Sequence, residues 1–214
     1  MTRLITELRG LHRGRDAWIM ASGASMDYVD PEFFRGRLTI AVNNMWRWFP
    51  CWYVVRKEHE GLAEFLRDKP ERVKAIVSEY DCGNLTHVRN ADIDDPDLYY
   101  FRHRENEHTR IDLTVMGTDD HIVVSFSTIT SAMHVAAYMG AANIILCGHD
   151  CGTLDGRTNI AGYPIRKKDW YRGWLKKIEP QTVTVKDALR KVYGCRVYSL
   201  NPFVNLGLEG HKYE

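Results

Sequence analysis

The chain has 214 residues, of which 44% are hydrophobic and 27% are charged, an ordinary balance for a globular protein with one sizeable core. Its 29 lysines and arginines offset 28 acidic residues and leave a formal net charge of +1, so no overall positive field attracts nucleic acid or an anionic membrane. Disordered, collagen-like and globally basic classes are therefore excluded, and any charged ligand must be bound by local groups.

The cysteines and the N-terminal segment point to a reducing compartment. The five cysteines are odd in number and widely scattered, in a chain of a size that needs no disulfides. Residues 1–18 interrupt their apolar residues with arginines and lack the apolar run of a signal peptide. No segment approaches the roughly 20 unbroken apolar residues of a membrane span. We therefore expect a cytoplasmic protein without a membrane span.

Short apolar runs alternate with helical patterns along most of the chain. Helical spacing predicts helices at 2–11, 31–34, 60–66, 128–139 and 185–192. Buried strands are predicted at 17–21, 38–42, 52–55, 73–77, 122–124, 143–147 and 195–200. This alternation predicts an α/β fold: a single Rossmann-like domain over residues 1–214, with a mostly parallel sheet flanked by helices.

Two segments lack apolar periodicity. Residues 81–120 are polar and acid-rich, which predicts a loop-rich insertion, and residues 152–181 predict a lid over the site. Within the lid, basic and aromatic residues concentrate at 166–177, where they could grip phosphates and stack on bases or sugars, or form a solvated helix with its aromatic face packed down. The first alternative predicts an anionic ligand, and a phosphorylated glycan or a nucleic acid would both suit it. Its binding residues would be Lys168, Trp170, Arg172 and Trp174.

Small and polar residues follow four of the predicted strands: 22–25, 43–44, 127–131 and 148–150. In an open parallel sheet, ligands bind beyond the carboxyl ends of the strands, where helix N-termini offer unpaired N–H groups. Small residues let a phosphate or ribose approach the backbone, and amides and hydroxyls supply neutral donors and acceptors. The pattern predicts a nucleotide site, although each loop by itself could be a simple turn.

The same segments resemble a known family. Residues 21–26, A-S-G-A-S-M, resemble the G-N-G-P-S-L loop of the bacterial lipooligosaccharide sialyltransferases, and 42–44 resemble their C-N-Q. Residues 128–132 and 144–150 are similar to R-I-T-S-G and I-Y-L-S-G-I-D. Further similarity to L-E-K-T-Y, Y-C-L and C-P-N lies at 189–193, 198–200 and Pro202. The family's relatives include archaeal 6-hydroxymethylpterin diphosphokinase-like proteins and flagellin glycosyltransferases.

The resemblance implies a glycosyltransferase with a cytidine-monophosphate sugar as donor and inversion by direct displacement. With the strand-end pattern, it assigns nucleotide binding to Ser22, Gly23, Ala24, Ser25, Asn43, Asn44, Thr130, Ser131 and Gly148. The family also uses a general-base histidine and two tyrosines at the leaving phosphate. Here the histidine position falls on or near Lys177, the first tyrosine falls near Gly152, and only Tyr163 can replace the second.

A general base needs a pKa near the working pH and hydrogen-bond reach of the acceptor hydroxyl. Asp150 or His149 could take this role. The candidate catalytic residues are therefore Asp150, His149, Tyr163 and Lys177. A changed acceptor would explain the departure from the family, and the alternative is a non-catalytic nucleotide- or nucleic-acid-binding protein.

A magnesium-dependent function and a zinc site remain open as hypotheses, although no cofactor is firmly implied. Diphosphate transfer from ATP would need magnesium, for which the candidates are Asp92, Asp94, Asp95, Asp119 and Asp120. A zinc site would use Cys147, His149 and Cys151 with Cys82 or His134, but the sequence has no C-x-x-C pair to support it. An aromatic cluster at 45–53 is core or a subunit contact, the latter implying a homo-oligomer.

Overall fold

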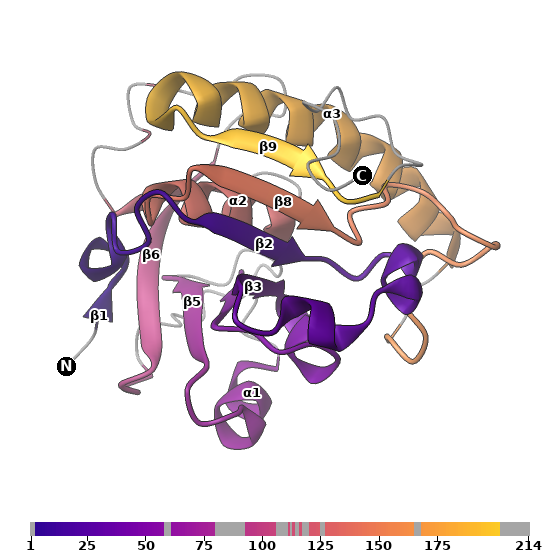
Figure 1. Ribbon diagram of the computed structural model, residues 1–214, viewed down its shortest axis with the longest axis horizontal. Helices are drawn as coiled ribbons and strands as arrows, with labels where there is room; N and C mark the ends of the chain where they lie inside the picture. The colour runs from indigo at the N-terminus through magenta and orange to yellow at the C-terminus, as the bar shows by residue number, and fades with distance from the viewer. Residues whose placement is uncertain are drawn as a thin grey trace.

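The computed structural model describes residues 3–57, 61–79, 93–105, 111, 113, 116, 120–124, 127–164 and 168–201. These residues form one nine-stranded sheet (Figure 1). The strands are β1 (Arg3–Leu4), β2 (Asp16–Met20), β3 (Leu38–Val42), β4 (Tyr53–Arg56), β5 (Lys74–Ser78), β6 (Leu98–Glu105), β7 (His121–Val124), β8 (Asn143–Cys147) and β9 (Arg196–Ser199). All pairs of neighbouring strands are parallel. The predicted fold class is confirmed.

The strand order is β1-β6-β5-β4-β3-β2-β8-β9, with β7 paired to the second half of β6. From β2 the chain moves outward in one direction through β3, β4, β5 and β6, and then returns to the other side of β2 at β8. The loops that leave β2 and β8 therefore diverge, which opens a crevice at the carboxyl ends of these two strands.

Helices and 3₁₀ turns cover both faces of the sheet. The helices are α1 (Leu62–Asp68), α2 (Thr128–Tyr138) and α3 (Lys168–Tyr193), and the 3₁₀ turns are η1 (Ile5–Leu8), η2 (Ala24–Tyr28), η3 (Pro31–Phe34) and η4 (Asn43–Arg47). On one face α2 and α3 pack against Ile19, Ile40 and Leu146. On the other face the packing involves Trp18 and Phe65. Sandwiched between the sheet and α3, every residue of α2 is buried.

The structure corrects three of the predicted elements. Residues 98–105, inside the predicted loop-rich insertion, form β6, whose run Leu98–Phe101 is buried between β5 and β1. Residues 2–11 were expected to be a helix, but β1 and η1 occupy this segment, with Arg3 paired to Tyr99. In each case the pairing partner is remote in sequence, so local periodicity did not reveal it.

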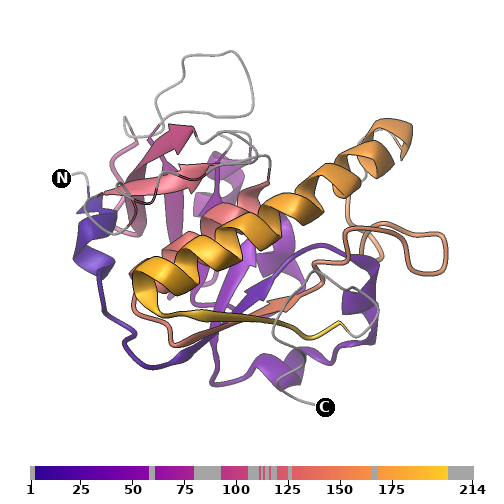
Figure 2. The same cartoon turned by 90° about the horizontal axis from the view of Figure 1, so that it is seen from above.

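The second half of the predicted lid is also different. One continuous helix of 26 residues, α3, spans Lys168–Tyr193, so residues 168–181 and the helix predicted at 185–192 form a single element. Figure 2 shows α3 crossing the molecule, with its N-terminal end extending beyond the sheet. None of the helices in the described part of the chain combines the length and apolar character needed to cross a membrane.

Candidate functional site

A cleft of about 600 Å³ lies at the carboxyl ends of β8, β2, β3 and β4, a volume suited to a small-molecule ligand. Strand ends contribute Ala21–Gly23, Asn43–Asn44, Arg56 and Gly148–Cys151. The opposite wall comes from Ser127–Ile129 at the start of α2, from Trp174, Leu175 and Ile178 of α3, and from Thr158, Asn159, Tyr163 and Pro164. Several of the predicted site residues therefore meet at the β2–β8 crevice.

Two glycines allow the loops after β2 and β8 to pack backbone against backbone. The Gly23 N–H donates to the Gly148 carbonyl at 2.8 Å. Gly148 has φ +67, and a Cβ there would lie 2.3 Å from Met26 Cγ and 2.4 Å from the Ala21 carbonyl oxygen. A Cβ on Gly23 would lie 2.3 Å from the Gly148 carbonyl oxygen. Only glycine fits at these positions, and both glycines line the cleft.

The Asp150 carboxylate joins three loops. Its Oδ2 accepts from Ser25 N at 2.8 Å, and its Oδ1 accepts from Ser25 Oγ and from Asn201 Nδ2, both at 2.6 Å. The loops after β2, β8 and β9 are thereby held together. Three donors already engage the carboxylate that was a candidate general base, so its geometry is that of a positioning residue. Nothing in the sequence indicated that Asn201 would donate to Asp150.

The first half of the predicted lid, 152–164, is anchored to the loop after β2. Asn159 Nδ2 donates to Ser22 Oγ at 2.9 Å, and the Ile160 N–H donates to the Ser22 carbonyl at 2.9 Å. Asp27 adds an ion pair with Arg157. Movement of this loop as a lid would have to break these contacts.

Tyr163, a candidate catalytic residue, reaches the cleft from the same loop. Its ring lies against Trp48, with the two centroids 5.5 Å apart. This ring contact places Tyr163 at the wall of the cleft that faces the end of β3.

Asn43 directly follows β3 and has an unsatisfied side-chain oxygen. Its φ is +54, a left-handed conformation that asparagine tolerates better than most residues. Its Oδ1 is buried and has no hydrogen-bond partner among the described residues, although it belongs to a residue that lines the cleft. A buried acceptor without a donor is costly in free energy, so a ligand N–H or O–H group that reached this atom would recover that cost.

The carboxyl end of β4 supplies a guanidinium group that the sequence analysis did not assign to the site. Arg56 lines the cleft and is 4% exposed. Its Nη1 donates to the Asn44 Oδ1 at 3.0 Å. In the sequence, Arg56 is simply a polar residue at a strand end. Its place in the cleft follows from the position of β4 next to β3.

His149 lines the cleft as a neutral imidazole. Burial lowers its pKa from 6.5 to about 4. Its Nε2 lies 2.7 Å from Thr182 Oγ1, and this hydroxyl donates to the Ile178 carbonyl at 3.2 Å. Since the hydroxyl proton is used there, Nε2 carries the imidazole proton and Nδ1 remains an acceptor.

Cys151 follows His149 closely and is also neutral. Its Sγ lies 3.4 Å from the His149 Nε2. Burial, with smaller effects from Glu179 and Asp150, raises the pKa of the thiol to about 12. The pair is therefore a neutral thiol beside a neutral imidazole rather than an activated thiolate.

Five of the predicted site residues do not line the cleft: Ala24, Ser25, Thr130, Ser131 and Lys177. Ala24 is fully buried in η2, and Ser25 lines a second pocket next to the cleft. Thr130 and Ser131 are fully buried, and their hydroxyls donate to the carbonyls of Ser127 at 2.7 Å and Val123 at 2.9 Å. The first turn of α2 faces the cleft through residues 127–129 instead. Lys177 is exposed on α3, whereas its neighbours Leu175 and Ile178 line the cleft.

Of the proposed acceptor-binding residues, Trp174 lines the cleft. The side chains of Lys168, Trp170 and Arg172 lie outside the described part of the structure. The anionic acceptor therefore stays a prediction.

The metal-site hypotheses gain no support from the described residues. In that part of the chain, no three histidine, cysteine, aspartate or glutamate side chains are grouped so that they could hold a metal ion. Asp95 Oδ1 accepts from the Asp97 N–H at 2.8 Å, and the buried Cys147 thiol donates to the Ile145 carbonyl at 3.8 Å. Cys82, Asp92 and Asp119 lie outside the described residues.

No model of a known protein family matches the chain, and no curated protein matches it significantly. Several solved structures are similar to it in fold. A variant of the sialyltransferase CST-II, with alanine in place of one asparagine and in complex with CMP, is 13% identical over 92% of this chain and 86% of that chain, with a TM-score of 0.56. CstII from Campylobacter jejuni in complex with the substrate analogue CMP-3FNeuAc is 13% identical over 90% of this chain and 84% of that chain, with a TM-score of 0.52.

At this level of identity the likeness concerns the fold. It supports a sialyltransferase-like α/β fold over nearly the whole chain. The comparisons do not bear on the pterin diphosphokinase-like branch of the resemblance.

Proposed function

We propose that this protein is a glycosyltransferase that uses a nucleotide-activated sugar, with a CMP-sugar as donor and an anionic acceptor. The observation that carries the proposal is the cleft at the carboxyl ends of the strands, which is lined by the Gly23–Gly148 backbone contact and by Asn43, whose buried Oδ1 has no partner among the described residues. The similar fold of sialyltransferases solved with CMP or a CMP-sugar analogue supports the same ligand class.

The cleft suits a ligand with few charges around its nucleoside. Ser22, Asn43, Ser127 and Thr128 offer neutral donors and acceptors. A second, mostly apolar pocket of about 400 Å³ shares Gly148 with the cleft and is lined by Tyr28, Val29, Leu154 and Leu200. A flat base fits such an apolar pocket, with the ribose over Gly148 and the phosphate in the cleft.

The proposed reaction is a direct displacement. The acceptor hydroxyl attacks the anomeric carbon, the bond from that carbon to the phosphate oxygen breaks, and the electron pair leaves with CMP. His149 is the proposed base because it lines the cleft as a neutral imidazole, and its lowered pKa of about 4 makes it a weak base. Tyr163 would donate to the leaving phosphate.

An inactive nucleotide-binding protein is the second candidate. The observation that favours it is the position of Lys177, which is exposed and outside the cleft although the family's general-base position falls on or near it. Sustained release of CMP from a CMP-sugar would exclude this candidate. We also keep the prediction of a reducing, cytoplasmic setting as part of the proposal.

The donor class is tested by thermal unfolding with CMP, CDP, UDP, GDP and ATP, with and without magnesium. We expect cytidine nucleotides to raise the melting temperature and Asn43→Ala to abolish the shift. Asn43→Gly is the sharper variant because glycine relieves the positive φ while removing Oδ1. It should fold at least as stably as the wild type and still lose the shift. No response of the wild type to any nucleotide would refute the proposal.

A further inference from the structure

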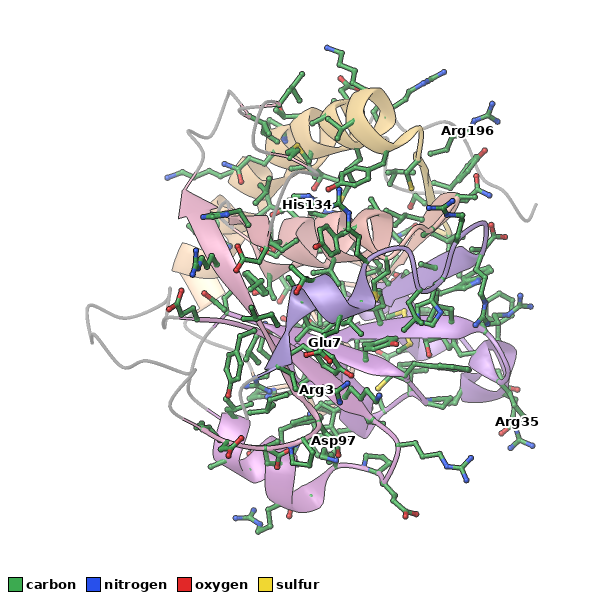
Figure 3. All side chains as sticks on the ribbon, turned by 90° about the vertical axis from the view of Figure 1, so that its left-hand side faces the viewer. Arg3, Glu7, Arg35, Asp97, His134 and Arg196 are labelled. Atoms are coloured by element: carbon green, nitrogen blue, oxygen red, sulfur yellow. The ribbon has the colours of Figure 1, made fainter. Side chains whose placement is uncertain are left out.

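A loop with exposed arginines lies at the opposite end of the sheet from the cleft. Residues 9–15 join η1 to β2, and Figure 3 looks onto this end of the molecule, where β2, β8 and β9 begin. From here β2 runs for five residues toward the cleft, a distance of about 15 Å for an extended strand. A surface at residues 9–15 is therefore separate from the proposed nucleotide site.

The N–H groups of this loop are all hydrogen-bonded. Each N–H from residue 9 to residue 15 donates to a backbone carbonyl at 3.3 Å or less. The N–H groups of residues 10, 12 and 14 donate to the carbonyls of residues 138–140, at 3.1, 2.7 and 2.9 Å, so the loop is built on the C-terminal end of α2. Since its donors are already used, the loop can lie in a region of low polarity without leaving an N–H group unsatisfied.

Two large apolar side chains are exposed at this loop. Leu11 is 58% exposed, and Trp52, which directly precedes β4, is 46% exposed. His12 follows Leu11 in the chain, and the centroid of its ring lies 6.2 Å from that of Trp52. Burial, with a smaller effect from Arg15, lowers the pKa of His12, so this imidazole is neutral at pH 7. Leu11 and Trp52 therefore have no charge between them, and indole side chains favour the interface between lipid and water.

Two arginines flank these apolar side chains. The Arg15 guanidinium lies 5.3 Å from the centre of the Trp52 ring. A Cβ on Gly10, the residue before Leu11, would lie 3.7 Å from Arg13 Nη2, so this second guanidinium lies over the loop. Both arginines are exposed, and within the described part of the chain neither forms an ion pair. Their charges are therefore available to an external anion.

The acidic residues closest in sequence do not neutralise the two arginines. Glu7 pairs with Arg3, with 3.0 Å between Oε2 and Nη2, and Asp16 Oδ1 accepts from Asn143 Nδ2 at 2.7 Å. Residues 9–16 contain three arginines and one aspartate, so this segment is positive although the whole chain is nearly neutral. Exposed apolar side chains beside arginines are typical of surfaces that bind anionic lipids.

We propose that Leu11, Arg13, Arg15 and Trp52 dock the protein onto an anionic membrane surface. Leu11 and Trp52 lie at the level of the lipid headgroups, and the two arginines bind the phosphates or carboxylates of anionic lipids. A nucleic acid fits less well because its phosphate backbone has no partner for Leu11. An acidic peptide strand fits less well because the N–H groups of the loop are already used. In this arrangement the cleft faces away from the membrane, and membrane binding does not depend on the proposed transferase activity.

The test is binding of the whole chain to large unilamellar vesicles, measured by co-sedimentation over a range of lipid concentrations. One set of vesicles contains phosphatidylcholine alone, and the other contains phosphatidylcholine with about a third phosphatidylserine. We expect the partition coefficient to be about 20-fold higher on the anionic vesicles, because each arginine near an anionic surface contributes about fivefold. Raising the salt concentration from about 50 mM to about 500 mM should abolish the difference.

A double variant tests the arginines. Arg13→Gln combined with Arg15→Gln should reduce the preference for anionic vesicles to less than about threefold. The variant is expected to fold, because both side chains are exposed and the loop is held by its backbone; thermal unfolding checks this. Arg67→Gln combined with Lys176→Gln removes the same two charges from exposed positions on α1 and α3. This matched control should bind as the wild type does.

Two single variants test the apolar side chains. Leu11→Ser should weaken binding to both kinds of vesicles by about fivefold and leave the preference for anionic lipid unchanged. Anionic vesicles should shift the tryptophan emission of the wild type to shorter wavelength, and Trp52→Phe should lose this shift.

Membrane docking is refuted if the wild type binds neither kind of vesicle at millimolar lipid, or binds both equally. It is also refuted if the double arginine variant binds as the control does. Binding of polyglutamate or of polyuridine RNA through Arg13 and Arg15, without binding of anionic vesicles, would assign this surface to an acidic peptide or a nucleic acid instead.

Discussion

Asp150 holds Ser25 through both of its carboxylate oxygens, with Oδ2 accepting from the Ser25 N–H at 2.8 Å and Oδ1 accepting from the Ser25 hydroxyl at 2.6 Å. The two residues are 125 positions apart in the chain and follow β2 and β8. Their contact, together with the amide of Asn201, keeps the crevice closed at its base. The geometry of the cleft therefore depends on this carboxylate.

Asp150→Asn should destabilise the protein. The NH₂ group of the new asparagine would face the Ser25 N–H or the Asn201 side-chain amide, both of which are donors. This clash of donors should lower the free energy of unfolding by about 2 kcal/mol. Urea unfolding measures this loss, and CMP affinity should fall with it. Asp155→Asn, which alters an exposed carboxylate bonded to Tyr28, is the matched control. Wild-type stability with lost turnover would instead make Asp150 catalytic.

Gly148→Ala should be far more costly than Gly36→Ala. Both glycines have a positive φ, +67 at Gly148 and +75 at Gly36. A Cβ on Gly148 would lie 2.3 Å from Met26 Cγ, whereas a Cβ on Gly36 would have no atom within 4 Å. The left-handed conformation by itself costs about 1 kcal/mol, and the overlap should bring the total at Gly148 to about 3 kcal/mol. Thermal or urea unfolding compares the two variants. Equal losses would mean that the loops after β2 and β8 separate easily.

His149→Gln and Lys177→Ala separate the two candidate bases. If His149 accepts the acceptor proton, His149→Gln should lower kcat for sugar transfer by about 100-fold or more. Lys177→Ala should leave kcat unchanged because this side chain is exposed and outside the cleft. Both variants are compared in steady-state transfer with a CMP-sugar. The opposite result would place the base on α3, as in the family that the sequence resembles.

Stability should fall between pH 6.5 and pH 4 because of two buried histidines. Burial lowers the pKa of His134 to about 3 and that of His149 to about 4, from the ordinary 6.5. Below pH 6.5 these histidines therefore bind protons in the unfolded chain but stay neutral in the folded chain. The stabilisation of the folded state is complete above pH 6.5 and is lost by about 1 kcal/mol per pH unit for each histidine as the pH falls.

His134 provides the variant for this pH dependence. It lies between α2 and α3 (Figure 3), accepting from the Val123 N–H at 3.0 Å and facing the Tyr193 hydroxyl at 2.9 Å. His134→Gln should reduce the slope of unfolding free energy against pH by about half, whatever its stability at pH 7. Urea unfolding at pH 7.5, 6.0 and 5.0 measures the slope. An unchanged slope would contradict burial as the cause.

The first part of the sheet and the place of a cleft at the carboxyl ends of its strands could be predicted from the sequence. Leu38–Val42 is apolar at nearly every position, as a strand buried on both faces must be. Glycine at 148 and asparagine at 43 mark the ends of such strands by residue type alone. These signals are local, since they depend on the chemistry of consecutive residues.

Other features depend on which elements pack together. Leu98–Phe101 becomes part of β6 because β5 offers a parallel partner. Residues 168–181 continue into one long helix, α3, where Leu175 and Ile178 are buried in the core. No nearby residue in the sequence specifies these partners.

The site residues, too, divide into those that the local sequence predicts and those that depend on how the elements pack. Residues 127–131 were predicted to bind nucleotide as a group, but α2 is enclosed between the sheet and α3, so only its first turn reaches the cleft and Thr130 and Ser131 bond within the protein. Arg56 enters the cleft because the strand order places β4 beside β3. The sequence by itself determined which residue types end each strand. The tertiary structure alone decided which of those ends face one another, because that depends on strand order and helix packing between distant segments.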